Sequence, residues 1–217
     1  MMHQQKKIIT IAKRLMPSSI IRYYLNKTDK KQILLTFDDG PHPDITPKVL
    51  DILDQYQARA IFFVKGCKIE QAPELLNEIL ARGHLLGNHT FHHSVDPRPS
   101  FSEYKNDIAL AQKAIHEVTG TKPKHFRPPC GILTIPYMLA IKLSGMKIVK
   151  WSYDTGEYSY YKNEPADVIG NFFLRAVQSR QVILSHDDNE KIPQVLEATL
   201  PRLVEMGFDL KGGVQAL

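Results

Sequence analysis

The chain has 217 residues, of which 43% are hydrophobic and 24% are charged, and its formal net charge is +5. This length and mixed composition are typical of one globular domain and exclude a fibrous or disordered protein. Its two cysteines, Cys67 and Cys130, lie too far apart to indicate a disulfide framework or a cysteine-based zinc site. The positive charge favours anionic surfaces, but no aromatic-interleaved basic stretch or nucleic-acid motif is present, so no nucleic-acid partner is expected.

Residues 1–31 form a basic amphipathic segment ahead of the expected main domain, residues 32–217. Lysines and arginines interrupt its apolar residues, so no run reaches membrane-spanning length and no secretory signal is evident. The favoured interpretation is a helix that packs across the domain, and the alternative is a segment that lies on an anionic membrane surface. A cytoplasmic or membrane-peripheral location is therefore expected.

From Gln32 onward, short β-type runs alternate with longer helical patterns, which predicts parallel strands joined by crossover helices. In chain order, the expected strands are 33–37, 60–64, 84–87, 125–127, 146–151 and 181–185, with 208–210 as a last strand that closes the sheet. The expected helices are 47–56, 72–82, 101–118, 136–143, 165–179 and 192–206. Thr46 is expected as the N-cap of the first helix and Pro47 as its first residue.

The ends of the expected strands carry ionisable side chains. In open parallel sheets and in barrels, catalytic groups gather at the carboxyl ends of the strands. Inspecting these ends together therefore gives a set of candidate catalytic and binding residues. The set comprises Asp38 and Asp39 before Gly40, His89 with His93, Arg127, Glu157 and His186.

The adjacent carboxylates of Asp38 and Asp39 are expected to face opposite sides of the strand end, because successive strand residues alternate. One could then bind a metal while its neighbour transfers protons. Asp-Asp-Gly is also a common turn sequence, so turn formation is the alternative interpretation.

His89 and His93 are four residues apart, a spacing that stacks two side chains on one face of a helical turn. Such a pair could share one cation with a carboxylate, which leaves coordination positions open, as hydrolytic zinc sites require. His92 lies one position off that face and is interpreted as a bystander or as a residue that supports a ligand from behind. A solvated histidine cluster remains the alternative.

Four motifs occur in an informative order: Thr36-Phe-Asp-Asp-Gly40, His89-Thr-Phe-His-His93, Arg127-Pro-Pro-Cys-Gly131 and Leu184-Ser-His186. With them, the chain resembles the polysaccharide deacetylase family, also called carbohydrate esterase family 4, from about residue 32 to residue 210. The resemblance implies an α/β fold, a distorted, incomplete (β/α) barrel of about seven parallel strands with outer helices. It also implies an acylated amino-sugar poly- or oligosaccharide as substrate, in cell-wall or exopolysaccharide modification.

By this resemblance, Asp39, His89 and His93 are the metal ligands, and Asp38 is the general base that takes a proton from the attacking water. Arg127 would hold Asp38 by an ion pair, which stabilises the charged form of the carboxylate. A donor set of one carboxylate and two imidazoles suits zinc first, and also cobalt, nickel or manganese.

The remaining roles also follow from the resemblance. The backbone N–H of Cys130 would help to stabilise the oxyanion, although the family usually has an aromatic residue there. Leu184 would pack against the acyl methyl group, with filling of the core as the alternative, and His186 would protonate the departing amine.

A degenerate fourth motif, Asp154-Thr-Gly-Glu-Tyr158, replaces the usual Asp-x-x-Asp-Trp of the family. Glu157 is the favoured carboxylate to orient His186, and Asp154 is the alternative. Tyr158 would keep an aromatic wall and adds a hydroxyl group. Two other functions stay open: the same site acting on another amide or an O-acetyl ester, and a carbohydrate-binding protein that has lost catalysis.

Overall fold

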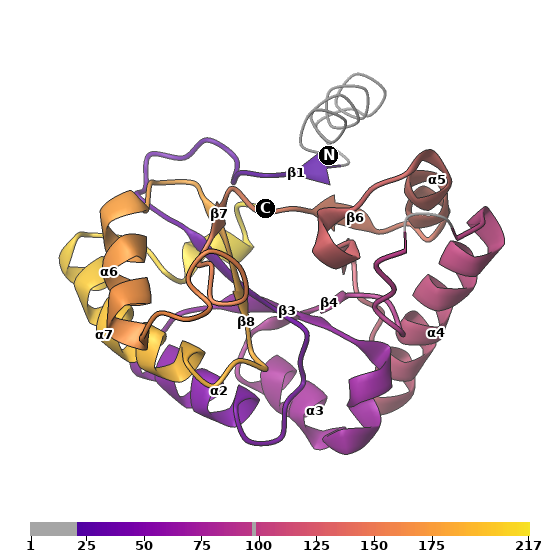
Figure 1. Ribbon diagram of the computed structural model, residues 1–217, viewed down its shortest axis with the longest axis horizontal. Coiled ribbons are helices and arrows are strands. Elements are labelled where there is room, and N and C mark those ends of the chain that lie inside the picture. The colour runs from indigo at the N-terminus through magenta and orange to yellow at the C-terminus, as the bar shows by residue number, and fades with distance from the viewer. Residues whose placement is uncertain (1–20, 97–98) are drawn as a thin grey trace.

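The computed structural model describes residues 21–96 and 99–217, which contain one eight-stranded sheet in the order β1-β6-β5-β4-β3-β2-β8-β7 (Figure 1). Every neighbouring pair of strands is parallel. The strands are β1 (Ile21–Arg22), β2 (Leu34–Asp38), β3 (Ala60–Val64), β4 (Leu85–Asn88), β5 (His125–Phe126), β6 (Lys147–Val149), β7 (Tyr153–Asp154) and β8 (Val182–His186).

The sheet curls without closing, and its helices lie along the outer side (Figure 1). The α-helices are α2 (Thr46–Gln55), α3 (Glu74–Ala81), α4 (Phe101–Thr119), α5 (Ile135–Leu143), α6 (Ala166–Ala176) and α7 (Ile192–Glu205). Short 3-10 helices span Gly66–Gln71, Pro129–Gly131 and Gly212–Val214. The expected incomplete (β/α) barrel is therefore confirmed.

The central strands are continuous apolar runs in the sequence because they are buried in the core. All residues of β2 and β3 are buried, as in parallel sheets that are covered on both faces. Between the sheet and the outer helices, Phe37 of β2 stacks on Phe62 of β3 with ring centroids 5.0 Å apart. The buried centre of the sheet thus positions the strand ends that carry the predicted catalytic residues.

Local signals fix the boundaries of the longest helix, α4. Ser100 accepts a hydrogen bond from the N–H of Glu103, whose carboxylate accepts one from the N–H of Ser100, which completes a capping box. Gly120 ends the helix in the left-handed conformation that glycine adopts without strain. These residues place α4 within one residue of its expected range.

Several sequence expectations about individual elements are wrong. The expected closing strand, 208–210, is only an isolated bridge between Asp209 and Gln32, while the two-residue strands β1 and β7 were not expected. Both were missed because two residues are too few to show a period. Thr46 is the first residue of α2 rather than its N-cap, which is Ile45, because the Thr46 hydroxyl donates to the carboxylate of Asp187.

The described part of the N-terminal segment, residues 21–31, packs against the sheet. Ile21 and Arg22 pair with β6, and Leu25 is buried and exchanges hydrogen bonds with Arg180. The expectations of a packed helix or a membrane contact rest mainly on residues 1–20, outside the described residues. Within the described residues, no helix is long and apolar enough to cross a membrane.

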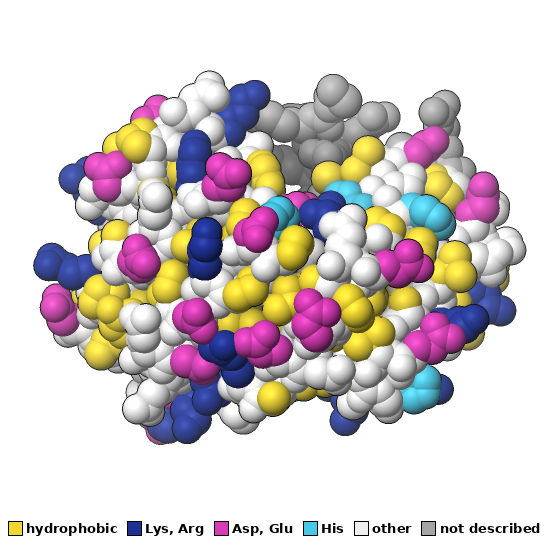
Figure 2. Space-filling view, turned by 90° about the horizontal axis from the view of Figure 1, so that it is seen from below, with side chains coloured by type: hydrophobic (Ala, Val, Ile, Leu, Met, Phe, Trp, Pro, Cys, Tyr) yellow, Lys and Arg dark blue, Asp and Glu magenta, His cyan; other side chains and the backbone are white. Residues whose placement is uncertain are grey.

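The described surface carries both signs of charge. On the face in Figure 2, acidic and basic side chains are interspersed among hydrophobic ones. The net charge of +5 is therefore not gathered into one basic area on that face.

Candidate active site

A cavity of about 440 Å³ opens where the central strands end at their carboxyl side. Nearly all the sequence-predicted residues contribute to it, whereas Arg127 and Glu157 lie behind its wall. The lining residues are Asp38, Asp39, His89, His93, Cys130, Trp151, Asp154, Tyr158, Ser159, Leu184 and His186.

Asp39, His89 and His93 form a cluster that could hold a metal ion. The Asp39 Oδ1 atom lies 3.3 Å from Nε2 of His93 and 3.5 Å from Nε2 of His89. A tetrahedral ion with bonds of about 2.1 Å would set neighbouring donors about 3.4 Å apart. This Oδ1 atom is buried and faces both imidazoles, and its one other charged neighbour among the described residues is the ammonium of Lys65, at 3.1 Å. One carboxylate and two imidazoles at these distances fit a divalent cation.

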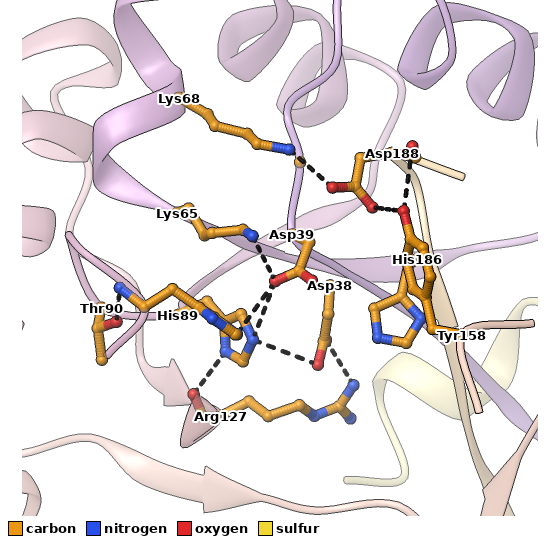
Figure 3. A network of polar contacts seen from close by, with 12 residues as sticks. Asp38, Asp39, Lys65, Lys68, His89, Thr90, Arg127, Tyr158, His186 and Asp188 are labelled. Carbon is orange, nitrogen blue, oxygen red and sulfur yellow. Dashed lines mark hydrogen bonds and ion pairs between the residues drawn. The ribbon is translucent and has the colours of Figure 1, made fainter. Parts of the chain in front are cut away.

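The orientation of His89 leaves one nitrogen free for a metal. Its Nδ1 lies 2.7 Å from the carbonyl oxygen of Arg127, and because a carbonyl only accepts, Nδ1 must carry the proton. With the proton on Nδ1, Nε2 is the nitrogen that can present a lone pair toward Asp39 (Figure 3). Burial, followed by the nearby His89, lowers the pKa of His93 to about 4, which favours the neutral form of that ring.

The expected helical turn around His89 and His93 is wrong. His89 directly follows β4, and the chain then passes through the left-handed conformation at Thr90, with φ 67°, and at His93, with φ 56°. The Thr90 hydroxyl accepts a hydrogen bond from the N–H of His93 and supports this turn. The two rings still meet, with centroids 4.8 Å apart, by a route other than helical stacking.

The expectation that Asp38 and Asp39 face opposite sides is also wrong. Asp38 ends β2 and Asp39 turns back with φ 76°, so both carboxylates point toward His89 (Figure 3). The Asp38 Oδ2 atom lies 3.6 Å from Nε2 of His89, close to the corresponding distance from Asp39. The burial of Asp39 alone would raise its pKa, but His89, His93 and Lys65 together lower it below its usual value.

Arg127 is fully buried beneath Asp38 and holds it. Its Nη1 donates to Oδ1 of Asp38 at 2.7 Å and to the hydroxyl of Thr36 at 2.7 Å. Its Nε and Nη2 donate to the carbonyl oxygens of Val149 and Lys150. These four hydrogen bonds use four of the five N–H donors of the buried guanidinium and fix the carboxylate at the edge of the cavity.

His186 lies beside Asp38, on the neighbouring strand of the sheet. The two residues are paired in the register of β2 and β8, which sets their backbones about 4.8 Å apart. The Nδ1 atom of His186 lies 2.8 Å from Oε1 of the buried Glu157. Burial would lower the pKa of His186, but the hydrogen bond and the charge of Glu157 outweigh it and raise the pKa to about 9. The raised pKa favours the protonated form of His186 at neutral pH.

Comparison with known proteins agrees with this geometry. The family model described as polysaccharide deacetylase matches residues 25–149, more than half of the chain. The chain belongs to the polysaccharide deacetylase family. The peptidoglycan-N-acetylglucosamine deacetylase PgdA of Listeria monocytogenes is 33% identical over 92% of the chain, which spans only 42% of that protein's length.

Two further relatives of this family match over most of their own length. A peptidoglycan-N-acetylglucosamine deacetylase of Bacillus cereus is 33% identical over 91% of the chain and 93% of its own length. The crystal structure of the Bc1960 peptidoglycan N-acetylglucosamine deacetylase in complex with a benzamide compound superimposes with a TM-score of 0.80, at 31% identity, covering 88% of this chain and 91% of its own.

The degenerate fourth motif of this deacetylase-family chain offers two carboxylates, Asp154 and Glu157, whose positions relative to His186 differ. Asp154 lines the cavity, but its carboxylate accepts hydrogen bonds from the N–H of Gly156 and the hydroxyl of Ser159. Glu157 alone of the two makes a hydrogen bond to His186. The geometry favours Glu157 as the residue that orients the imidazole.

The other expected pocket residues lie in the cavity wall. Leu184 sits two residues before His186 on β8 and is 4% exposed. Cys130 follows β5 in the left-handed conformation, with φ 49°, is exposed as a residue and lines the cavity. Partial burial of its thiol, followed by the charge of Asp39, raises the pKa of the thiol, which does not favour a nucleophilic thiolate. The ring of Tyr158 meets that of His186 edge to face at 4.9 Å.

Several residues around the cavity were not predicted from the sequence. Lys65 follows β3, with its ammonium 3.1 Å from Oδ1 of Asp39, and Trp151 follows β6 and lines the cavity. Lys68 and Asp188 form an ion pair after β3 and β8. Their positions after strands were available in the sequence, but lysines and tryptophans after strands have no motif to distinguish them from ordinary surface residues.

Proposed function

We propose that the chain is a metal-dependent deacetylase that hydrolyses the N-acyl group of amino-sugar-containing poly- or oligosaccharides. One observation carries the proposal: the carboxylate of Asp38 and the imidazole of His186 flank a three-residue metal cluster from two paired strands. Amide hydrolysis needs a proton acceptor for the attacking water and a proton donor for the departing amine. The site supplies both within one cavity.

Asp38 is the proposed general base. Its buried carboxylate is held by Arg127, so that one oxygen is directed toward the metal cluster, 3.6 Å from Nε2 of His89. At that place it accepts a proton from the water that attacks the acyl carbon. The hydrogen bond from Arg127 holds the carboxylate in place for this transfer.

His186 is the proposed general acid. Its Nδ1 donates to Glu157, so Nε2 of the imidazolium is free to give its proton to the amine nitrogen as the carbon–nitrogen bond breaks. The raised pKa keeps this proton in place at neutral pH. Glu157 then stabilises the imidazolium before transfer and holds the ring in one orientation.

Asp39, His89 and His93 are the proposed metal ligands. A divalent ion bound to them would lower the pKa of a water molecule and polarise the acyl carbonyl. One carboxylate and two neutral imidazoles suit zinc best, with cobalt, nickel and manganese as alternatives. The backbone N–H of Cys130 is proposed to hydrogen-bond the oxyanion, and Leu184 to contact the acyl methyl group.

The relatives of Listeria monocytogenes and Bacillus cereus, which are named for peptidoglycan N-acetylglucosamine, support a substrate class. We propose N-acetylglucosamine units of a glycan as the substrate of this chain. Trp151 and Tyr158 give the cavity the aromatic walls that are common in ligand sites.

The test measures acetate released from N-acetylglucosamine oligomers and from peptidoglycan by the zinc-loaded protein. Asp38→Asn is expected to reduce the rate by a factor of about 100 to 10,000, because it removes the base while keeping the shape of the side chain. A chelator should abolish the activity, and zinc should restore it.

His92→Ala is the matched control. This histidine adjoins a ligand but lies largely exposed and pairs with Asp107, so its loss should leave the rate within about twofold of the wild type. If Asp38→Asn keeps the wild-type rate, the assignment of the base is wrong. Acetate from acetylated xylan but not from amino sugars would instead identify an esterase.

A further inference from the structure

Three loops that follow different strands are fastened together beside the cavity. The Nζ atom of Lys68, in the 3-10 helix after β3, donates to Oδ2 of Asp188 at 2.7 Å. The hydroxyl of Tyr158, in the loop after β7, donates to Oδ1 of the same carboxylate at 2.9 Å. Asp188 follows β8, so its two oxygens join the other two loops (Figure 3).

This cluster of Lys68, Asp188 and Tyr158 is shielded on one side and open on the other. The side chains of Lys68 and Asp188 are 23% and 13% exposed, so their ion pair is partly desolvated. Tyr158, in contrast, is 48% exposed and lines the cavity. The polar end of the ring is therefore fixed to protein while its apolar part stays available to a ligand.

The position of the ring depends on the hydroxyl contact. Tyr158 lies in an irregular segment of turns, where no helix or strand restrains the side chain. Its ring meets His186 edge to face, a contact that directs it without locking it. Burial and then the charge of Asp188 raise the pKa of the tyrosine, which keeps its hydroxyl protonated as a donor.

We propose that Asp188, neutralised by Lys68, is a positioning residue that holds the Tyr158 ring as one wall of the sugar-binding cavity. The inference rests on the proposed function, because it assigns the cavity to a sugar. Asp188 and Tyr158 take no part in the chemical step, which is assigned to Asp38, His186 and the proposed metal ligands. Loss of the Asp188 contact therefore weakens substrate binding and leaves the rate of bound substrate nearly unchanged.

Trp151 provides a readout of binding that does not need turnover. It is the single tryptophan of the chain and lines the same cavity as Tyr158. Titration of an N-acetylglucosamine tetramer into zinc-loaded protein carrying Asp38→Asn gives a dissociation constant from its emission. Steady-state assays on the otherwise unchanged protein give KM and kcat separately.

Asp188→Ala and Tyr158→Phe are each expected to weaken tetramer binding and raise KM about tenfold, with kcat within about twofold of the wild type. Asp188→Asn retains an acceptor for the hydroxyl and should restore binding to within about threefold of the wild type. The double variant should bind no more weakly than either single variant, since both remove one interaction.

Tyr160→Phe is the matched control, because it removes the hydroxyl of an 83% exposed tyrosine in the same loop. It should bind as the wild type does. Three results would each overturn the inference. They are an Asp188→Ala protein that binds the tetramer as tightly as the wild type, a double variant whose losses of affinity add up, and single variants in which kcat falls while KM is unchanged.

The outcomes also separate this inference from the proposed function. If the wild type binds the tetramer, Asp188→Ala weakens that binding, and the wild type releases no acetate, the deacetylase proposal is refuted and the positioning role stands. If the wild type releases acetate and the Asp188 and Tyr158 variants bind and react as it does, the deacetylase proposal stands and the positioning role is refuted.

Discussion

The pairing of His186 with Glu157 gives a quantitative prediction for Glu157→Gln. The amide keeps the size of the side chain and an oxygen that can accept from Nδ1, but it removes the charge that raises the pKa of His186 to about 9. The variant weakens the hydrogen bond and removes the charge, which are the two largest raising causes, while burial still disfavours the imidazolium and Asp38 and Asp39 still favour it. The pKa should therefore fall to about 6.5, the ordinary value for histidine.

The magnitude follows from the fraction of protonated imidazole. At pH 8 a pKa of 9 leaves about 90% of His186 protonated, whereas a pKa of 6.5 leaves about 3%. Glu157→Gln should therefore lower kcat about thirtyfold at pH 8 and less than about twofold at pH 6. Because a cation bound at Asp39 repels the imidazolium equally in both proteins, the difference between their basic limbs is the tested quantity.

The same shift predicts a change in stability. The raised pKa contributes to the free energy of unfolding below pH 6.5, and this contribution is lost as the pH rises through about 9. A shift of this size corresponds to about 3 kcal/mol. Denaturant unfolding should therefore show the largest difference between wild type and Glu157→Gln in mildly acidic buffer and almost none above pH 9.

The assay is kcat against pH from 5.5 to about 9.5, with acetate release as the signal and Asp154→Asn as the control. Asp154 makes no hydrogen bond to His186, so its variant should keep the basic limb within a few tenths of a pH unit. A uniform loss of activity at every pH in Glu157→Gln, with the limb unmoved, would refute the reasoning. A limb that moves only in Asp154→Asn would assign the role to Asp154.

Three further predictions concern the metal cluster and the packing beneath it. Arg127→Met should lower the free energy of unfolding by about 3–5 kcal/mol, measured with urea, because it leaves buried Asp38 without its cation; an unchanged midpoint would contradict this. His93→Ala should lose the zinc that the wild type retains through gel filtration, measured by elemental analysis, and full retention would exclude His93 as a ligand. Gly87→Ala should cost about 1–3 kcal/mol and lower Tm, because a Cβ at this place would lie 2.3 Å from the ring of Phe63; a wild-type Tm would show that the ring moves freely.

The sequence was sufficient for the long elements and for the inventory of the site. The buried runs of β2, β3 and β8 and the capped helix α4 have signals that act within a few residues, so their positions could be predicted. Most of the motif residues line one cavity, and Arg127 and Glu157 lie directly behind its wall, because parallel strands end on the same side of the sheet.

Local geometry was harder to predict where the backbone leaves the common conformations. The left-handed residues Asp39, Thr90 and His93 redirect side chains in a manner that neither strand alternation nor helical spacing describes. Contacts between distant loops, such as Lys68 with Asp188, depend on the three-dimensional arrangement and have no local signal at all. The sequence thus predicted which residues form the site but not how their side chains are oriented.

The pairing of Asp38 with His186 in adjacent strands makes correct assembly of the sheet a condition for the proposed catalysis. A slip of one residue between β2 and β8 would turn the side chains of the moved strand to the opposite face, exposing apolar residues and separating the two proposed proton-transfer groups at once. A misaligned chain would then be both unstable and inert. Recovered turnover after refolding should therefore count the correctly aligned molecules in a sample.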